Sequence, residues 1–192
     1  MTGLYKKTEQ FVIDSFTKAN DSLGIKHSLR TVYWMKKLNP DAEEALLISA
    51  VAHDIERAFR SSGKGFSEGD HLKHHQEEGA RIMGDFLEKN GSSKAFIDKV
   101  KSLITRHEAG GDSDQDMLKD ADSLSFFENN AVAFVNEKAG KMGKEKVKEK
   151  FDWMFERMTS DRAKQIAKPL YEEAIRKLEN MNFLKPRMGN NT

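Results

Sequence analysis

The chain has 192 residues, 33% charged and 38% hydrophobic, and its 32 basic residues nearly balance its 31 acidic ones. This length suits one domain with a single buried core, and a net charge of +1 gives no support for a large nucleic-acid surface. No apolar segment approaches the roughly 20 residues that cross a bilayer, and the first residues lack a secretory signal. The absence of cysteine excludes thiolate metal ligands. We therefore expect a cytoplasmic protein without a membrane span, in which any metal is held by nitrogen and oxygen.

Helical periodicity begins near the N-terminus. Thr8 to Ala19 carries an apolar stripe, and a turn rich in Asn, Asp and Gly follows it. A second helix is predicted from about Ile25 to Leu38. Its inward face passes through His27, Thr31 and Trp34, in steps of four and three residues. His27 therefore belongs to a buried stripe.

The next predicted helix is the most apolar part of the chain. Ala45 to Ala52 contains one polar residue, Ser49, and is followed directly by His53 and Asp54. Such a run indicates a helix buried on most of its circumference, which we expect to end near Phe59. A buried carboxylate costs several kcal/mol or more unless a cation, a shifted pKa or a metal compensates it.

A glycine-rich loop from Ser61 to Asp70 comes next, and it is either a cover over a site or a plain connection. A helix is predicted from about Asp70 to Lys89. On it, His75 shares the apolar face, whereas His74 falls on the wetter flank. His71, one turn earlier, could join His75.

Two further helices carry candidate ligands. Lys94 to His107 ends its apolar stripe with the histidine itself, and a loop from Gly110 to Gln115 follows. The next helix, Gln115 to Asn129, contains Asp120 and Asp122 in a mostly apolar context. Periodicity does not choose between these two aspartates.

The rest of the chain predicts two or three more helices between residues 131 and 181, the last of them kinked by Pro169. Residues 182–192 are expected to form a loosely held tail. No strand with convincing alternation and no internal repeat is present. The sequence therefore predicts an all-α protein.

Six polar side chains are predicted to face the interior from five helices. They are His27, His53, Asp54, His75, His107 and an aspartate at position 120 or 122. A single histidine on an apolar face is usually a satisfied core residue, and a purely structural network is the alternative here. Imidazole and carboxylate are, however, the usual ligands of divalent metals where cysteine is absent, and burying so many polar groups without a shared cation would leave several unsatisfied. A metal site is favoured.

The order of these residues resembles the HD-domain superfamily of metal-dependent phosphohydrolases, which are all-helical. The resemblance rests on His27 in HSLRTV, on the adjacent His53 and Asp54, and on DADSLSFF, and it covers roughly residues 24–128. It implies an HD-domain helical bundle spanning residues 1–192 as a single domain. It also implies four metal ligands: His27, His53, Asp54 and Asp122.

Some members of the superfamily hold a second metal with two further histidines, and His75 and His107 match those positions. The resemblance then implies one or two divalent ions (Mn, Mg, Fe, Ni or Zn) and hydrolysis of a phosphate ester or anhydride, expected to be that of a nucleotide, by a metal-activated water. We assign catalytic roles to Asp54, His75 and His107, with Asp54 as the natural bridging ligand. We favour two metals, although His75 and His107 could instead bind phosphate or donate protons beside one.

The sequence departs from the superfamily after the histidine–aspartate pair. Many members continue with glycine and lysine, whereas Ile55, Glu56 and Arg57 follow here. Arg57 could bind phosphate through its guanidinium, or be an exposed arginine or a partner of Glu56. The acidic pair that marks (p)ppGpp hydrolases is missing, which disfavours that substrate.

Other cations are weaker candidates for binding substrate. Lys64, His74, Arg106 and Lys73 are near the predicted site in sequence, although each is more often a solvated surface residue. The expected partner is a small phosphate ester, and a homodimer is left open. Two other functions remain: a di-iron oxygenase on the same ligands, and a nucleotide-binding sensor without turnover.

Overall fold

Every regular element in the described part of the chain is helical. The computed structural model describes residues 2–60 and 68–181, without the side chains of residues 68–72. The elements are α1 (Gly3–Lys18), α2 (Ser22–Leu38), α3 (Glu44–Ala52), a 3-10 helix (Ile55–Phe59), α4 (Glu68–Lys89), α5 (Lys94–Arg106), α6 (Ser113–Ser125), a π-helical turn (Phe126–Asn130), α7 (Ala131–Met142), α8 (Lys144–Glu156) and α9 (Asp161–Glu179). The all-α fold class is confirmed.

Side-chain caps place several helix starts earlier than apolar periodicity predicts. Thr2 accepts a hydrogen bond from the backbone nitrogen of Tyr5, so α1 begins at Gly3 rather than Thr8. Asp112 and Gln115 form a capping box, so α6 begins at Ser113 rather than Gln115. Both differences arise because a cap depends on polar residues ahead of the first apolar position.

The apolar helix α3 is shorter than its hydrophobic pattern predicts. It is buried on most of its surface, and the hydroxyl of Ser49 donates to the carbonyl oxygen of Ala45, 2.8 Å away. The α-helix ends at Ala52, however, and not near Phe59. His53 and Asp54 form a turn, after which the chain tightens into a 3-10 helix. Over so few residues, apolar spacing does not distinguish α from 3-10 geometry.

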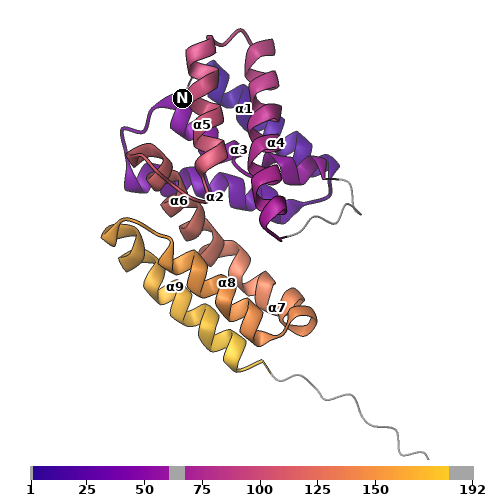
Figure 1. Ribbon diagram of the computed structural model, residues 1–192, viewed down its shortest axis with the longest axis vertical. Helices are drawn as coiled ribbons and strands as arrows, with labels where there is room; N and C mark the ends of the chain where they lie inside the picture. The colour runs from indigo at the N-terminus through magenta and orange to yellow at the C-terminus, as the bar shows by residue number, and fades with distance from the viewer. Residues whose placement is uncertain (1, 61–67, 182–192) are drawn as a thin grey trace, which may run out of the picture.

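Two apolar clusters build the interior, one mostly within α1 to α6 and one within α6 to α9. The first contains Tyr5, Phe16, Met35, Leu46, Ile48, Met83, Ile104 and Leu118, and the second contains Leu124, Phe127, Phe151, Met154, Ala167 and Leu178. Figure 1 shows α7, α8 and α9 as a layer below the bundle of α1 to α5, with α6 leading from one to the other. Trp34 and Leu38 of α2 pack against both clusters. The two layers therefore share an apolar contact.

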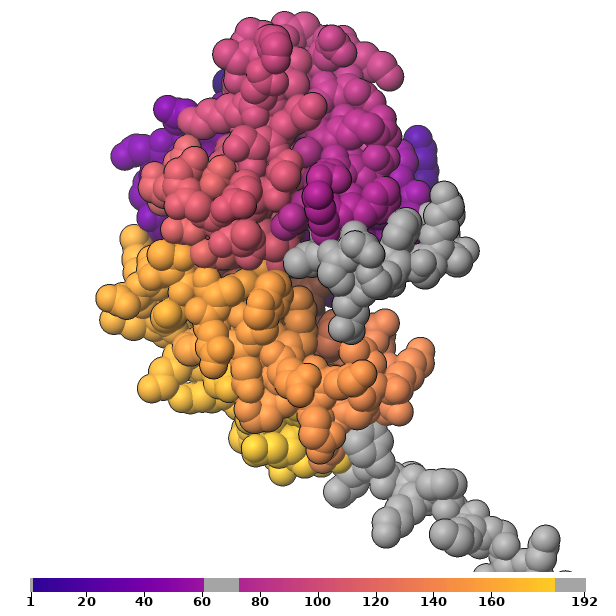
Figure 2. Space-filling view, viewed as in Figure 1, coloured from indigo at the N-terminus to yellow at the C-terminus, as the bar shows by residue number. Residues whose placement is uncertain are grey.

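The last helix, α9, runs through Pro169 without interruption, and the predicted kink there stays a prediction. Figure 2 shows the C-terminal helices, orange to yellow, packed directly under the magenta and pink surface of α4 and α5.

Among the described helices, none combines the length and the apolar composition needed to cross a bilayer. The predicted loop from Ser61 to Asp70 lies largely outside the described residues, and α4 already begins at Glu68.

Candidate metal centre

Six side chains from the sequence prediction converge in the interior of the upper layer. His27 is on α2, His53 and Asp54 are in the turn after α3, His75 is on α4, His107 caps the end of α5, and Asp122 is on α6. All six are buried. His74, by contrast, is exposed, so the inward and outward faces of α4 are as the periodicity predicts.

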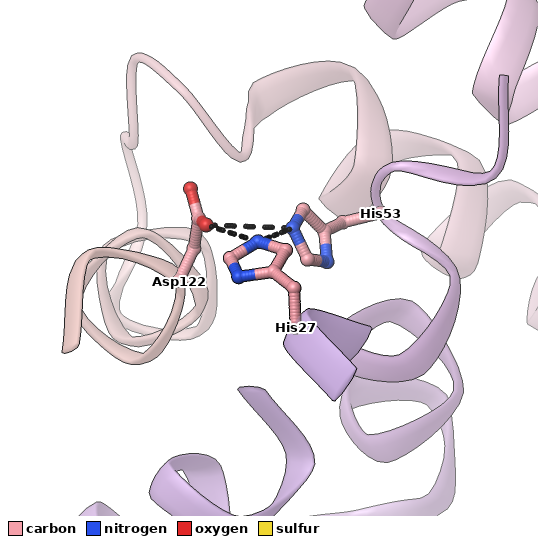
Figure 3. Close-up of side chains that lie close together, drawn as sticks. All are labelled: His27, His53 and Asp122. Atoms are coloured by element: carbon pink, nitrogen blue, oxygen red, sulfur yellow. Dashed lines mark hydrogen bonds and ion pairs between the residues drawn. The ribbon is translucent and has the colours of Figure 1, made fainter. Parts of the chain in front are cut away.

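One group of potential ligands consists of His27, His53 and Asp122. The Nε2 atoms of the two histidines lie 3.1 Å apart, and Oδ1 of Asp122 lies 3.0 Å from His27 Nε2 and 3.4 Å from His53 Nε2. Figure 3 shows the three side chains pointing toward one another from separate helices and turns. Ligands about 2.0–2.2 Å from one metal ion lie about 3 Å from each other, so these separations suit a shared ion.

The ring orientation of both histidines directs a lone pair to the centre of this group. Nδ1 of His53 lies 3.0 Å from the carbonyl oxygen of Ala50, which accepts its proton. Nδ1 of His27 lies 3.0 Å from Oγ of Ser125, whose own hydroxyl donates to the His27 carbonyl oxygen. In a neutral ring the Nε2 atom is then an acceptor. Two such acceptors and a carboxylate need a proton or a metal ion between them.

The pKa of His53 indicates the same need for a proton or a metal ion. Burial disfavours a charge on this ring, but the carboxylates of Asp54 and Asp122 outweigh it and raise the pKa of His53 to about 9. A metal ion would compete with that proton, because imidazole must be deprotonated to act as a ligand.

The second group consists of Asp54, His75 and His107. His75 Nε2 lies 2.9 Å from Asp54 Oδ1, and its Nδ1 lies 2.7 Å from Oε2 of Glu56. Glu56 is itself buried, and hydrogen bonds from His75 and Arg60 outweigh the effect of burial and lower its pKa to about 2. A carboxylate behind a histidine is the usual arrangement that orients an imidazole toward a metal.

His107 carries the most informative atom of the site. Its Nδ1 donates to the carbonyl oxygen of Ile104 at 2.7 Å, and its Nε2 is buried without a hydrogen-bond partner among the described residues. Burial lowers the pKa of His107 to about 4, so the ring is neutral and Nε2 presents a lone pair. Two carboxylate oxygens lie within 4 Å of this Nε2 atom, Asp54 Oδ1 at 3.9 Å and Glu108 Oε1 at 3.8 Å. A lone pair facing two carboxylates is unfavourable unless a cation is bound there.

Asp54 lies between the two groups. Its Oδ1 faces His75 and His107, while its Oδ2 lies 3.8 Å from Nε2 of both His27 and His53. Each group therefore receives one oxygen of the same carboxylate. A carboxylate in this position can offer one oxygen to each group.

Two arginines compensate the buried carboxylates. Burial alone would raise the pKa of Asp54, but Arg57, with Nε 2.9 Å from Oδ2, and the histidines hold it well below its usual range. Arg157, buried at the end of α8, makes ion pairs with Asp122 and Glu108 and likewise keeps the pKa of Asp122 well below its usual range against the effect of burial. Both aspartates are therefore ionised, as metal ligands must be.

The structure separates the two aspartates that periodicity left undecided. Asp120 points away from the histidines and accepts hydrogen bonds from the backbone nitrogens of Thr159 and Ser160, at 2.7 and 2.9 Å. These nitrogens lie just before α9. Asp120 therefore has a structural partner, whereas Asp122 faces the histidines.

The predicted substrate-binding cations are not all brought to the site. Arg57 is half exposed and lines a cavity beside the ligands. Arg106 instead donates to the carbonyl oxygen of Gly110 at 3.0 Å, and neither it nor His74 lines that cavity. Lys73 is exposed and lies 3.8 Å from Glu77. Lys64 lies outside the described residues.

The cavity beside the ligands has a volume of about 210 Å³. Its inner wall contains His27, Asp54, Glu108 and Asp122, and its outer wall is formed largely by α7, α8 and the π-helical turn before α7. The candidate ligands are therefore reachable from a cavity that the C-terminal helices help to enclose.

The profile of one known family matches most of this chain. The profile of the DUF4202 family, a domain of unknown function, matches residues 13–178. The chain belongs to the DUF4202 family. The matched span includes most of both apolar clusters and all six candidate ligands. A search of curated proteins gave no significant match for this DUF4202 chain.

A solved structure shares the fold of this DUF4202 chain. It is the crystal structure of a predicted HD superfamily hydrolase from an uncultured Thermotogales bacterium, 20% identical, with a TM-score of 0.60, over 91% of this chain and 88% of that one. The HD-domain helical bundle predicted from the sequence is confirmed as the fold. A relative this distant shows the fold, and the activity must be argued from the site.

Sequence reasoning missed four polar residues of the site. Glu56, Ser125, Glu108 and Arg157 were not proposed as parts of it, although each contacts a candidate ligand. Glu56 and Glu108 lie next to predicted ligands in sequence, so their proximity was a usable signal. Arg157 lies 35 residues after Asp122 and carried no such signal.

Proposed function

We propose that this protein is a metal-dependent phosphohydrolase that cleaves a phosphate ester or anhydride, of a nucleotide in particular. The observation that carries the proposal is the unpartnered, buried Nε2 of His107, which faces the carboxylates of Asp54 and Glu108. A neutral imidazole in this position suits a divalent cation and is unfavourable without one.

The donor set supports two ions in one compact centre. His27, His53 and Asp122 would hold one ion, His75 and His107 would hold the other, and Asp54 would contribute an oxygen to each. All ligands are nitrogen or oxygen, which suits Mn, Mg, Fe, Ni or Zn. When bound, such ions lower the pKa of a coordinated water toward neutrality and polarise a phosphoryl oxygen.

The chain's own residues prepare this chemistry. Glu56 accepts the Nδ1 proton of His75, and backbone carbonyls accept those of His53 and His107, so each ring keeps its Nε2 lone pair directed inward. Arg57 lines the cavity with about half of its side chain exposed, so its guanidinium can meet a phosphate while it remains paired with Asp54.

The test combines metal analysis with a hydrolysis screen. The protein is purified without chelator, its metal content is measured per chain, and phosphate release is followed over nucleoside mono-, di- and triphosphates and simple phosphate esters. We expect one to two ions per chain and release of phosphate or pyrophosphate that chelator abolishes and added metal restores. Oxygen consumption without phosphate release would indicate an oxygenase, and bound nucleotide without turnover would indicate a sensor.

A further inference from the structure

Lys150 reaches the cavity beside the candidate ligands from α8, outside the region that carries the HD motif. It lines the cavity together with Arg57, Glu108 and Asp122. Among the residues that the structure describes, no hydrogen bond or ion pair involves its ammonium group. Most cations near this site, including Arg57 and Arg157, are by contrast paired with carboxylates.

Aromatic rings hold Lys150 in this position. Its Nζ lies 4.1 Å from the centre of the Trp153 ring and 6.0 Å from that of Phe126. Ring faces attract an ammonium group without neutralising its charge. Lys150 is thus oriented by its neighbours while its hydrogen-bond donors remain available to an anion.

The pKa of Lys150 also indicates that its ammonium group is available to an anion. Burial, together with the positive charges of Arg157 and Arg57, outweighs the nearby carboxylates and lowers the pKa of Lys150 to about 8. The ammonium is therefore protonated at neutral pH and makes no ion pair with a carboxylate of the described residues. An anionic group of a ligand would supply one.

The wall of the cavity next to Lys150 is apolar. Phe126, in the π-helical turn, and Phe134, on α7, both line it, with ring centroids 5.9 Å apart, and Leu23 and Met154 line it as well. A π-helical turn rotates the residues that follow it, and such turns are frequent at functional sites. The cavity volume of about 210 Å³ is smaller than the roughly 300–1,000 Å³ of pockets for drug-sized ligands. The apolar wall therefore suits a compact apolar group.

We propose that α7, α8 and the turn between α6 and α7 form the substrate-recognition half of this site. In this arrangement Lys150 and Arg57 bind the two charges of a phosphate monoester, and Phe126 and Phe134 contact a compact apolar part of its leaving group. The proposal rests on the proposed function and narrows its substrate from nucleotides and phosphate esters in general to small phosphate monoesters with a compact apolar leaving group. It assigns to the C-terminal helices a role in binding substrate as well as in packing.

Lys150→Met tests the anion subsite directly, with inorganic phosphate as the probe. Phosphate binding to the metal-loaded protein is measured by calorimetry. We expect the variant to lose at least tenfold in affinity, which corresponds to about 1.4 kcal/mol, with unchanged metal content and circular dichroism. Lys150→Arg should retain most of the affinity. Lys146→Met is the matched control, because Lys146 is exposed on the same helix one turn earlier.

The apolar wall has its own probe. Phenyl phosphate should bind the wild-type protein more tightly than methyl phosphate, and Phe134→Ala should reduce that preference while leaving the affinity for inorganic phosphate unchanged. Equal affinities of wild-type protein for phenyl and methyl phosphate would contradict the assignment of this wall to the leaving group.

The outcomes separate this proposal from the proposed function. If Lys150→Met binds phosphate as tightly as the wild type, or if the metal-loaded wild type binds no phosphate, the subsite is overturned even in a protein that hydrolyses phosphate esters. If phosphate binding depends on Lys150 but no ester is hydrolysed, the subsite stands and the proposed activity fails.

Discussion

Asp54 links the two groups of histidines through a single side chain. Each of its oxygens faces a different group, and Arg57 compensates its charge in the protein. In the proposed centre Asp54 would contribute to both ions, whereas each histidine would contribute to one. The loss of Asp54 should therefore affect both ions together.

We expect Asp54→Ala to lose nearly all bound metal and all phosphatase activity, because the variant removes the one ligand common to both groups and leaves the cations undercompensated. Elemental analysis and the phosphate-release assay measure the two effects. Asp41→Ala, which changes an exposed aspartate, is the control and should behave like the wild type. Stoichiometric metal and full turnover in Asp54→Ala would show that Asp54 is only a carboxylate at the end of a helix.

His75 and His107 distinguish a two-metal site from a one-metal site. Both belong to the second group, so His75→Ala and His107→Ala should each lower metal content from about two ions per chain toward one. Turnover should fall by orders of magnitude, because one half of the phosphoryl-binding clamp is lost. His74→Ala changes the exposed neighbour and should do much less. One ion in the wild type, with metal content unaffected by these variants, would place both histidines around a mononuclear site.

The inward direction of three candidate ligands could be predicted from sequence, because their helices have a clear apolar spacing. His27 and His75 fall on apolar stripes, and His107 ends one. Arg157 could not be predicted, because its role depends on the tertiary fold that brings the end of α8 to Asp122 and on no local pattern. Periodicity alone also failed to separate Asp120 from Asp122, because α6 is buried on both of the faces that carry them.

At the scale of elements, Asp120 shows how α6 positions α9. Its carboxylate accepts hydrogen bonds from two successive backbone nitrogens just before α9 begins, and only 2% of Asp120 is exposed. Backbone donors without partners in a buried position cost free energy. Asp120 therefore holds the start of the last helix, a structural role that is separate from the metal centre two residues later.

Asp120→Ala should destabilise the protein by about 1–3 kcal/mol, because both backbone nitrogens lose their acceptor, while metal content stays unchanged. Asp122→Ala should have the converse effect on metal, with loss of the ion held by His27 and His53. Denaturant unfolding and elemental analysis of the two variants make a matched pair. If Asp120→Ala lost metal and Asp122→Ala kept it, the assignment of the two aspartates would be reversed.

The ends of elements were harder to predict than their existence. The apolar run of α3 predicts a buried helix, and this is correct, but its change to a 3-10 helix after Asp54 depends on local backbone geometry. That change places Glu56 behind His75. Hydrophobic spacing reports which face is buried and carries little information about where a helix tightens.

At the scale of the whole molecule, the two apolar clusters meet through α2. Trp34 and Leu38 pack against both, and Glu128 at the start of the C-terminal layer binds Arg30 and the Trp34 indole nitrogen. Arg157 adds a polar link from α8 to Asp122. With these contacts we propose that the chain is one cooperative domain.

Phe151→Ala tests that cooperativity, because Phe151 is fully buried in the C-terminal cluster and its ring contacts among the described residues are with phenylalanines. Removing a buried phenylalanine side chain costs about 3–5 kcal/mol. In a single domain this loss should lower the denaturant midpoint of metal release by the same amount as that of helix unfolding, since coincident probes are the mark of a two-state transition. If helix content fell in two steps and metal release kept its wild-type midpoint, the C-terminal helices would form a separate folding unit, and Arg157 would contribute little to holding Asp122.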